Sequence, residues 1–311
     1  MSNTELEAAL SNNLQSLTAN INISSKVKLN EAMNYSVLPA GKLFRPKLAM
    51  ATYLDKGGDS QNLADIYHFC SFLEFHHAYS LVHDDLPSMD DDDMRRGRAS
   101  THKAYGEWMG VLTGDALLSA SYQSLTKIKH PQSMNILKFC TWALGPKGLI
   151  LGQAYDMSGQ INSGLADLLL THLLKTGRLI QCALVGGRAL SEDKMSYSEL
   201  KKYMRMGKSI GLIFQLIDDL SELADDNLGE HEKEINRWIS SPVQLFEALQ
   251  EQLKELDKLY EDDHVEVKKV LSKYFQKMKA IILDGQQNIK SHLGENQSDL
   301  IPVIQLLERL C

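Results

Sequence analysis

Cysteine is scarce and scattered in this sequence, with only Cys70, Cys140, Cys182 and Cys311 in 311 residues. No two of them form a C-x-x-C pair, so their spacing predicts neither a zinc site nor a disulfide framework, and a reduced compartment is expected. Basic charge is also in short supply, because 33 lysines and arginines face 40 acids and leave a net charge of -7. An acidic surface attracts neither nucleic acid nor an anionic membrane, so neither is expected as a partner.

Two further absences concern export and membranes. The N-terminal segment MSNTELEAALSNNL carries acids where a signal peptide has a basic start. No later apolar run approaches the roughly 20 residues that span a bilayer. We therefore expect a cytoplasmic protein that does not insert stably into a membrane.

Helical periodicity, in contrast, extends along almost the whole chain. Apolar residues recur at helical spacing, as at Leu245, Leu249, Leu253 and Leu256, whereas strand-like alternation is rare. Only 7 prolines occur, mostly where helices should begin or end. Because no linker, repeat or change of composition divides the chain, we predict a single all-α domain of ten or more helices over residues 1–311, with the tail from about residue 243 acting as scaffold.

The first acidic cluster places six aspartates within ten residues, directly before three arginines. The acids are Asp84, Asp85, Asp90, Asp91, Asp92 and Asp93, and the arginines are Arg95, Arg96 and Arg98. An isolated acidic run is usually a solvated loop, but His77, Ser80 and Asp84 share one face of a helix predicted over about 61–83. Asp84 would lie at the C-terminus of that helix, where the macrodipole disfavours negative charge and a divalent cation would compensate it.

The spacing of Asp84 and Asp90 requires a bend in the chain. Six residues of regular helix would leave the two carboxylates off a common face, and Pro87 interrupts the helix so that Asp90 can turn back towards Asp84. Asp91, seven residues on, is a competing partner. The alternating acids and central glycine of a calcium-binding EF-hand are absent.

The second acidic cluster lies on a strongly helical segment, GKSIGLIFQLIDDLSEL. Asp218 and Glu222 are four residues apart and share a helix face, with Asp219 beside them. Apolar neighbours predict a mostly buried helix, in which these carboxylates would be costly without a cation. Gly207 and Gly211 on the same stripe allow two interpretations, either room beneath the acids or a close helix crossing.

Two carboxylate clusters of this kind suit a diphosphate held by Mg2+, which prefers oxygen ligands. Mg2+ would stabilise a diphosphate leaving group and make C–O ionisation to an allylic carbocation feasible. Such a cation needs a pocket that excludes water. A second substrate with its own phosphate needs a basic site, and Lys42 and Arg45 in AGKLFRP lie three residues apart before a predicted helix, where both can contact an anion.

In its motifs the chain resembles the trans-polyprenyl diphosphate synthases, and most closely the bacterial farnesyl diphosphate synthases among them. GKLFRP is similar to the family's GKRLRP, HAYSLVHDDLPSMDDDDMRRG is nearly the whole first aspartate-rich segment, and GDAL, GQAYD, KTG and FQLIDD follow in the expected order. The resemblance covers about residues 36–225. It implies one all-α isoprenoid synthase domain, usually a homodimer, with both acidic clusters around a central cavity.

The resemblance also implies a role for each site residue. Asp84, Asp85 and Asp90 would bind Mg2+ at the allylic diphosphate, and Asp218, Asp219 and Glu222 would hold the remaining Mg2+. Arg95 would contact the allylic diphosphate, while Lys42, Arg45, His77 and Arg96 would hold isopentenyl diphosphate. Lys175, Thr176 and Gln215 would line the allylic site and steady the cation and the departing diphosphate, which in this family takes the final proton. The expected catalytic residues are Asp84, Asp85, Asp90, Lys175 and Asp218. His77 and Thr176 also have ordinary structural interpretations, as a core residue and a helix cap.

Three departures from the family pattern bear on activity. Leu43 replaces an arginine, Glu222 replaces the usual aspartate, and the family's lysine-bearing segment is not identifiable in DDNLGEHEKEINRWISSP. Lys233 and Arg237 are the candidate replacements for that lysine. Reduced turnover or an altered partner is the expected consequence if neither replaces it.

Product length in this family depends on the residues four and five before the first aspartate, here Ser80 and Tyr79. Tyr79, together with the Pro87–Ser88 insertion, resembles synthases that join dimethylallyl or geranyl diphosphate to isopentenyl diphosphate and stop at farnesyl diphosphate. A geranylgeranyl product is the alternative, since one aromatic side chain is a soft stop and the two glycines leave space. Two other functions are less favoured. A terpene cyclase needs no isopentenyl site. A non-catalytic synthase subunit should have lost the acidic residues, which this chain keeps.

Overall fold

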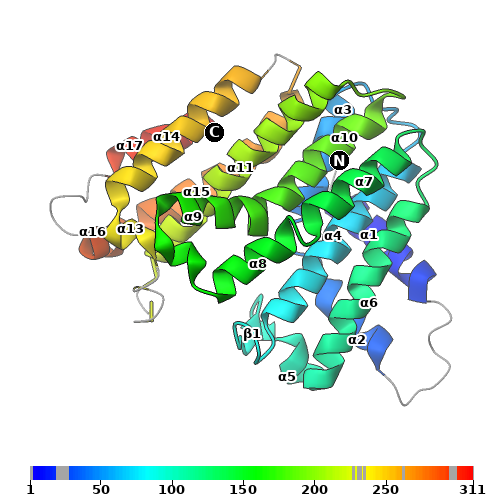
Figure 1. The fold of residues 1–311 in the computed structure, drawn as a ribbon, viewed down its shortest axis with the longest axis horizontal. Coiled ribbons are helices and arrows are strands. Elements are labelled where there is room, and N and C mark those ends of the chain that lie inside the picture. The colour runs from blue at the N-terminus through cyan, green and yellow to red at the C-terminus, as the bar shows by residue number, and fades with distance from the viewer. Residues whose placement is uncertain are drawn as a thin grey trace. The chain divides into compact units, whose positions relative to one another are not determined.

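Helices dominate the computed structural model, which describes residues 3–18, 28–225, 228–229, 233, 236–260, 263–293 and 300–310. These residues form sixteen α-helices, a 3-10 helix, a π-helix and a short two-stranded hairpin, so the predicted all-α fold class is confirmed (Figure 1). The chain divides into two compact units, Met1–Lys138 with Gly186–Lys194, and Phe139–Val185 with Met195–Cys311. The single domain over residues 1–311 stays a prediction.

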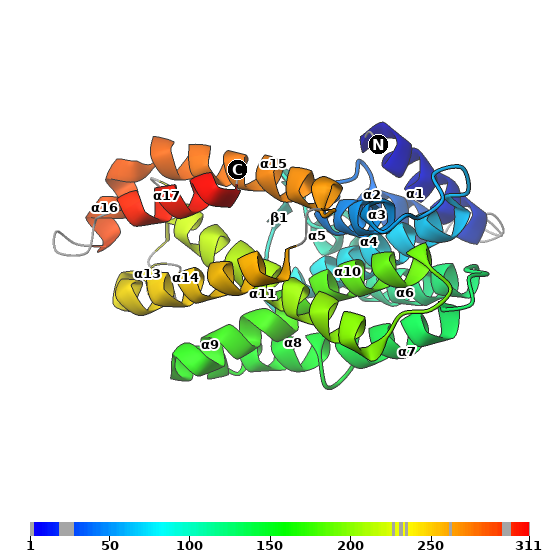
Figure 2. The same cartoon turned by 90° about the horizontal axis from the view of Figure 1, so that it is seen from above.

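Unit 1, Met1–Lys138 with Gly186–Lys194, is organised around one central helix. Its elements are α1 (Asn3–Thr18), α2 (Leu29–Val37), α3 (Phe44–Asp55), α4 (Ala64–Asp84), β1 (Met94–Arg95), β2 (Arg98–Ala99), α5 (Thr101–Tyr105), α6 (Glu107–Thr126), the first part of α7 (Ser133–Leu144) and the end of α10 (Arg178–Ser191). α4 packs against α1, α2, α3 and α6, and both cartoon views show α4 beside α6 (Figure 2). More than half of its residues are buried, and Phe69, Phe72 and Phe75 are fully buried. The core helix of this unit therefore carries Asp84 at its end.

Unit 2, Phe139–Val185 with Met195–Cys311, is organised around α11. Its elements are the rest of α7 and α10, α8 (Leu149–Met157), the 3-10 helix η1 (Gln160–Ser163), α9 (Leu165–His172), the π-helix η2 (Leu173–Gly177), α11 (Tyr197–Glu222), α13 (Arg237–Ser240), α14 (Pro242–Leu259), α15 (Val265–Asp284), α16 (Gln286–Leu293) and α17 (Ile301–Leu310). A capping box of Ser196 and Glu199 begins α11, which packs against α9, η2, α14 and α15. Pro242 occupies the first turn of α14, as its sequence position predicts.

One helical stretch among the described residues, Leu165–Ser191, is long and apolar enough to cross a membrane by length and composition alone. The sequence pattern had predicted no such stretch. Its most apolar part is 67% buried inside the protein, which is typical of a core helix.

His76 is an uncharged histidine in the core of unit 1. Its side chain in α4 is 1% exposed, and its ring lies edge-on to Tyr79 with centroids 4.6 Å apart. Burial lowers the pKa of His76 to about 3. The His76 imidazole is therefore neutral in the folded protein at neutral and mildly acidic pH.

We predict that His76 makes the protein less stable as the pH falls below about 6.5, the usual histidine pKa. Between that pH and the folded-state pKa of about 3, only the unfolded chain binds the proton, so folding loses about 1.4 kcal/mol per pH unit. Urea unfolding of the wild type and of His76→Gln at pH 7.5 and 5.5 measures this. The wild type should lose about 1 kcal/mol more than the variant, and equal losses would contradict the assignment.

Candidate functional site

After α4 ends at Asp84, the chain turns back on itself. The amide of Asp90 donates to the carbonyl of Asp84 at 2.9 Å, and the amide of Asp91 donates to the carbonyl of Leu86 at 3.1 Å. Pro87 lies inside this turn, and Asp91 has a positive φ of 52°. The bend expected at Pro87 is therefore present, and the residue whose backbone it joins to Asp84 is Asp90 rather than Asp91.

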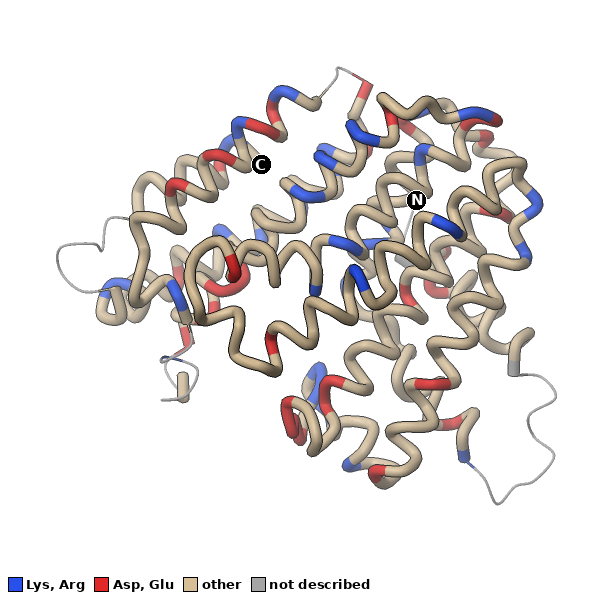
Figure 3. Tube along the Cα trace, viewed as in Figure 1, with Lys and Arg blue, Asp and Glu red and all other residues tan. Residues whose placement is uncertain are grey.

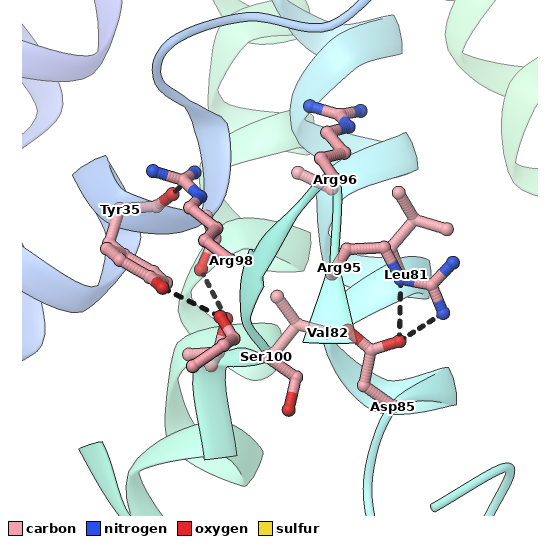
Figure 4. A pocket seen from close by; sticks show the side chains of 12 residues that line it. Tyr35, Leu81, Val82, Asp85, Arg95, Arg96, Arg98 and Ser100 are labelled. Atoms are coloured by element: carbon pink, nitrogen blue, oxygen red, sulfur yellow. Dashed lines mark hydrogen bonds and ion pairs between the residues drawn. The ribbon is translucent and has the colours of Figure 1, made fainter. Parts of the chain in front are cut away.

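Asp85 is buried beside this turn and is held by Arg95 of β1. Nε of Arg95 donates to Oδ1 of Asp85 at 2.8 Å, Nη2 donates to the same oxygen, and Nη2 also donates to Oδ2 of Asp92 at 2.7 Å. Figure 4 shows the guanidinium facing the Asp85 carboxylate. Burial raises the pKa of Asp85, while the hydrogen bonds and charge of Arg95 oppose that shift. Two acids thus fix the position of Arg95.

A tight hairpin places the neighbouring arginines. Arg96 and Gly97 form its two-residue turn with φ of 55° and 77°, the sign that a type I′ turn requires at both positions. Arg98 of β2 donates to the carbonyl of Tyr35 and, at 3.0 Å, to that of Leu38. Arg98 therefore fastens the hairpin to the end of α2, and Arg95, Arg96 and Arg98 all line one pocket there (Figure 4).

Arg96 reaches back to the GKLFRP segment. A Cβ on Gly41 would lie 2.8 Å from Cζ of Arg96, so the glycine is what allows the guanidinium to rest against this backbone. Nη2 of Arg96 also lies 3.9 Å from Oε1 of Glu74, a carboxylate that is 3% exposed. Burial raises the pKa of Glu74, and the charges of Arg96 and Arg45 oppose that shift. Two of the predicted basic residues thus lie near Glu74, an acid that was not among the predicted site residues.

Glu74 lies three residues before His77 on α4, and this spacing is the signal that could have found it. Desolvation, assisted by the charges of Arg45 and Arg96, lowers the pKa of His77 well below its ordinary value. His77 is therefore neutral at neutral pH. The hydroxyl of Ser80 donates to the carbonyl of His77 at 2.9 Å.

Leu43 and Tyr79 are core side chains of unit 1. Leu43 is 2% exposed, has φ of 51° and directly precedes α3, whereas Lys42 beside it is exposed. The family's arginine is therefore replaced by a side chain that points into the core. Tyr79 is 7% exposed, and burial raises its pKa.

The second group of candidate residues depends on a contact between two glycines. A Cβ on Gly211 of α11 would lie 2.6 Å from Cα of Gly177 in η2, and one on Gly207 would lie 2.7 Å from Cα of Gln181 in α10. No side chain fits at either position without moving backbone. The glycines therefore form a close helix crossing, and the interpretation that they leave room beneath the acids is wrong.

A chain of polar contacts runs across this crossing. Oγ1 of Thr176 donates to Oε1 of Gln215 at 3.0 Å, and Nε2 of Gln215 donates to Oδ1 of Asp219 at 2.7 Å. The other oxygen, Oδ2, lies 3.2 Å from Nε2 of His172, a buried residue at the end of α9. One carboxylate oxygen of Asp219 thus accepts a hydrogen bond, and the other lies next to the His172 ring without a hydrogen bond to Nε2. His172 was not among the predicted site residues, and its only signal in the sequence is that it lies three residues before Lys175.

Lys175 is held by an acid from α8. Its Nζ lies 2.5 Å from Oδ2 of Asp156. One turn earlier on α8, a Cβ on Gly152 would lie 2.4 Å from the backbone nitrogen of Lys175. The GQAYD motif therefore supplies both a glycine for close approach and the partner of the lysine. Asp156 lies within this motif but was not predicted as a site residue.

Asp218 and Glu222 occupy the last turns of α11. The hydroxyl of Tyr274 in α15 lies 3.4 Å from Oδ1 of Asp218, and its ring stacks on Phe214 with centroids 4.6 Å apart. Glu222 is exposed. Tyr274 belongs to the tail that was expected to be scaffold, so this tail also contacts the second acidic cluster, and nothing in the sequence marked it.

The candidate replacements for the missing lysine are described only in part. Arg237 of α13 donates a hydrogen bond to the carbonyl of Asn162. Residues 226–227, 230–232 and 234–235, which flank Lys233, lie outside the described residues. Asn236 donates to the carbonyl of Asp219 at 2.7 Å, which attaches this part of the chain to α11. Which basic residue, if either, takes the lysine's place stays a prediction.

The predicted site residues thus form two groups, one in each unit. The first comprises Lys42, Arg45, His77, Tyr79, Ser80, Asp84, Asp85, Asp90, Arg95 and Arg96, and the second comprises Lys175, Thr176, Gln215, Asp218, Asp219 and Glu222. Acidic and basic segments lie next to each other in the loop and hairpin that follow α4 (Figure 3). That the two groups enclose a central cavity stays a prediction.

The sequence matches the family model of the polyprenyl synthetases over residues 26–278, and the chain belongs to this family. It is 36% identical to the farnesyl diphosphate synthase of Micrococcus luteus over 208 residues, which cover 65% of this chain and 70% of that protein. It is also 37% identical to geranylgeranyl pyrophosphate synthase 4 of Arabidopsis thaliana over 200 residues, or 62% of this chain and 52% of that protein. The resemblance inferred from the motifs is confirmed.

The fold also matches solved structures of this family. A geranyltransferase from Helicobacter pylori, complexed with magnesium and isoprenyl diphosphate, has a TM-score of 0.68 and 25% sequence identity. The alignment covers 89% of this chain and 99% of that protein. The isoprenoid synthase type of all-α fold is therefore confirmed.

We predict that Gly211→Ala destabilises the protein although alanine is the better helix former. The new methyl group would lie 2.6 Å from Cα of Gly177, and overpacking of this kind typically costs about 1–3 kcal/mol against about 1 kcal/mol gained in helix propensity. Urea unfolding followed by circular dichroism measures the difference. Gly164→Ala is the matched control, because nothing lies within 4 Å of a Cβ at that position. A Gly211→Ala protein as stable as the control variant would contradict the close crossing.

Proposed function

We propose that this chain condenses dimethylallyl or geranyl diphosphate with isopentenyl diphosphate, head to tail, to give farnesyl diphosphate. The observation that carries the proposal is that unit 1 has an acidic surface and a basic surface on the same helix. At the end of α4 the turn joins Asp90 to Asp84, and two turns earlier on the same helix Arg45 and Arg96 surround His77 and Glu74. One surface suits a diphosphate with bound cations, and the other suits a diphosphate bound directly by basic side chains.

The donor atoms of both acidic clusters fit Mg2+. Asp84, Asp85 and Asp90 in the first cluster and Asp218, Asp219 and Glu222 in the second would supply carboxylate oxygens, the ligands that this ion prefers. Arg95 donates to Asp85 and Gln215 donates to Asp219, so hydrogen bonds also orient these two carboxylates. When bound, Mg2+ would neutralise the negative charge that develops on the departing diphosphate.

The basic residues divide between the two substrates. Arg95, fixed by Asp85 and Asp92, and Lys175, fixed by Asp156, would donate hydrogen bonds to the allylic diphosphate. Lys42, Arg45, Arg96 and the neutral His77 would hold isopentenyl diphosphate. Because Arg95, Lys175 and Arg96 each lie against a carboxylate, little ordering of these three side chains remains when the substrates bind.

The reaction exchanges one bond for another. The C–O bond of the allylic diphosphate breaks, and its electron pair leaves with the diphosphate. The double bond of isopentenyl diphosphate then attacks the allylic cation, and a proton is lost to form the new double bond. Thr176 and Gln215, joined at 3.0 Å, would present their polar atoms to the cation, and the departing diphosphate would take the proton.

Tyr79 supports the farnesyl product over the geranylgeranyl alternative. It is buried, and its ring packs on His76 with centroids 4.6 Å apart, so it is a firmer stop than an isolated aromatic side chain. The geranylgeranyl alternative relied on space beside Gly207 and Gly211, and neighbouring backbone fills that space. The similarity to a farnesyl diphosphate synthase supports the same product. The homodimer and the cytoplasmic location stay predictions.

We expect the purified protein to make farnesyl diphosphate from geranyl diphosphate and isopentenyl diphosphate in the presence of Mg2+. Hydrolysis of the product and chromatography of the extracted alcohols would show farnesol as the main species. Geranylgeraniol as the main species would assign the alternative product. No elongation from either dimethylallyl or geranyl diphosphate would refute the synthase proposal.

We predict that Asp84→Ala and Asp218→Ala each abolish turnover while leaving the helical circular dichroism unchanged. Loss of cation-assisted charge stabilisation of about 4 kcal/mol corresponds to about a thousandfold lower kcat. Asp193→Ala is the control, because this exposed aspartate pairs only weakly, with His130 at 3.8 Å. Near-normal turnover of either Asp84→Ala or Asp218→Ala would show that its carboxylate does not serve the reaction.

A further inference from the structure

Two aspartates of the first acidic cluster and a histidine of α5 form a group that the proposed reaction does not use. Asp91, Asp93 and His102 each offer one possible metal-ligating atom, and these three atoms lie within 4.8 Å of one another. The two carboxylates are exposed, whereas His102 of α5 is 4% exposed. The group is separate from Asp84, Asp85 and Asp90, because none of its members belongs to that set.

His102 is the member that indicates a ligand. Its Nδ1 lies 3.0 Å from Oγ of the buried Ser100, and its Nε2 is buried with no hydrogen-bond partner in the part of the chain that the structure describes. A buried polar atom without a partner is costly. If Nδ1 carries the proton and donates it to Ser100, Nε2 keeps a lone pair. Metal-binding histidines commonly donate their second N–H to a neighbour in this way.

The net charge around this group is negative, which favours a divalent cation. Nζ of Lys103 lies 2.7 Å from Oδ1 of Asp93, so an ammonium group already compensates one of the two carboxylates. The charge of Asp91, which lies in the turn after α4 with a positive φ of 52°, also acts on Lys103. One ammonium group therefore faces two carboxylates, and the group keeps a net negative charge.

We propose that Asp91, Asp93 and His102 bind a transition-metal ion, of the class Mn2+, Co2+ or Zn2+. Imidazole selects such ions over Mg2+, which prefers oxygen ligands alone. A metal–ligand distance of about 2.1 Å places the ligand atoms about 3 Å apart, so the site closes by a small rotation of two exposed aspartates. The ion ties the acidic turn to α5 and displaces Lys103 from Asp93. This site does not depend on the proposed function.

Titration of the full-length protein with Co2+, without diphosphate, tests the site. The expected result is one tightly bound Co2+ per chain with visible absorption, retained in Asp84→Ala and in Asp92→Asn, the matched control from the same loop. His102→Gln and Asp91→Asn should each weaken binding at least tenfold. Lys103→Met should tighten binding, because it removes the competing ammonium group.

Two results with variants, and one competition experiment, would overturn the proposal. One is Co2+ binding that is unchanged in Asp91→Asn. Because Asp91 is exposed, this variant should fold even if His102→Gln does not. The other is binding that disappears in Asp84→Ala, which would assign the ion to the carboxylates of the proposed reaction. Competition by Mg2+ at equal concentration would likewise show that the imidazole is not a ligand.

Discussion

The second group of site residues depends on the approach of two backbones at Gly211 and Gly177, where a Cβ would lie 2.6 Å from the opposing Cα. Because no side chain separates them, the KTG segment lies directly against α11. That proximity is what lets a short side chain such as Thr176 reach Gln215. It also lets α9, the helix that leads into KTG, bring His172 to Asp219. The glycines serve the chemistry by being small, and the polar side chains are placed as a consequence.

Close approach at a glycine also places Arg96 in unit 1, where the guanidinium rests on Gly41. Here the second constraint is electrostatic, because Glu74 and Asp85 are buried carboxylates. A buried acid needs a nearby cation, and each of these two faces an arginine. The arginines held in this way are the ones proposed to bind the two diphosphates. Charge that is unfavourable inside the protein thus positions the residues to which the proposal assigns substrate binding.

The sequence predicts those features that depend on local geometry. The end of α4 at Asp84 and the bend at Pro87 follow from helix periodicity and proline chemistry, and both are present. Features that depend on contacts distant in sequence were not predictable. His172 approaches Asp219 from another helix, and Tyr274 approaches Asp218 from α15. Gly211 shows the boundary between these cases, because its position on the helix was evident while the backbone filling the space beneath it was not.

The contacts of Glu222 and Arg237 show which departure from the family pattern matters most for binding a diphosphate. Glu222 is exposed in the last turn of α11, and the hydrogen bond between Gln215 and Asp219 does not involve it. Arg237 is constrained in a different way, because its guanidinium is bonded to the carbonyl of Asn162 at the end of η1. To act as the missing lysine it would have to break that bond, and the free energy lost there would reduce what it contributes to substrate binding. The substitution at residue 222 is therefore the smaller change, and the altered segment before α13 is where this chain differs most in how it could hold a diphosphate.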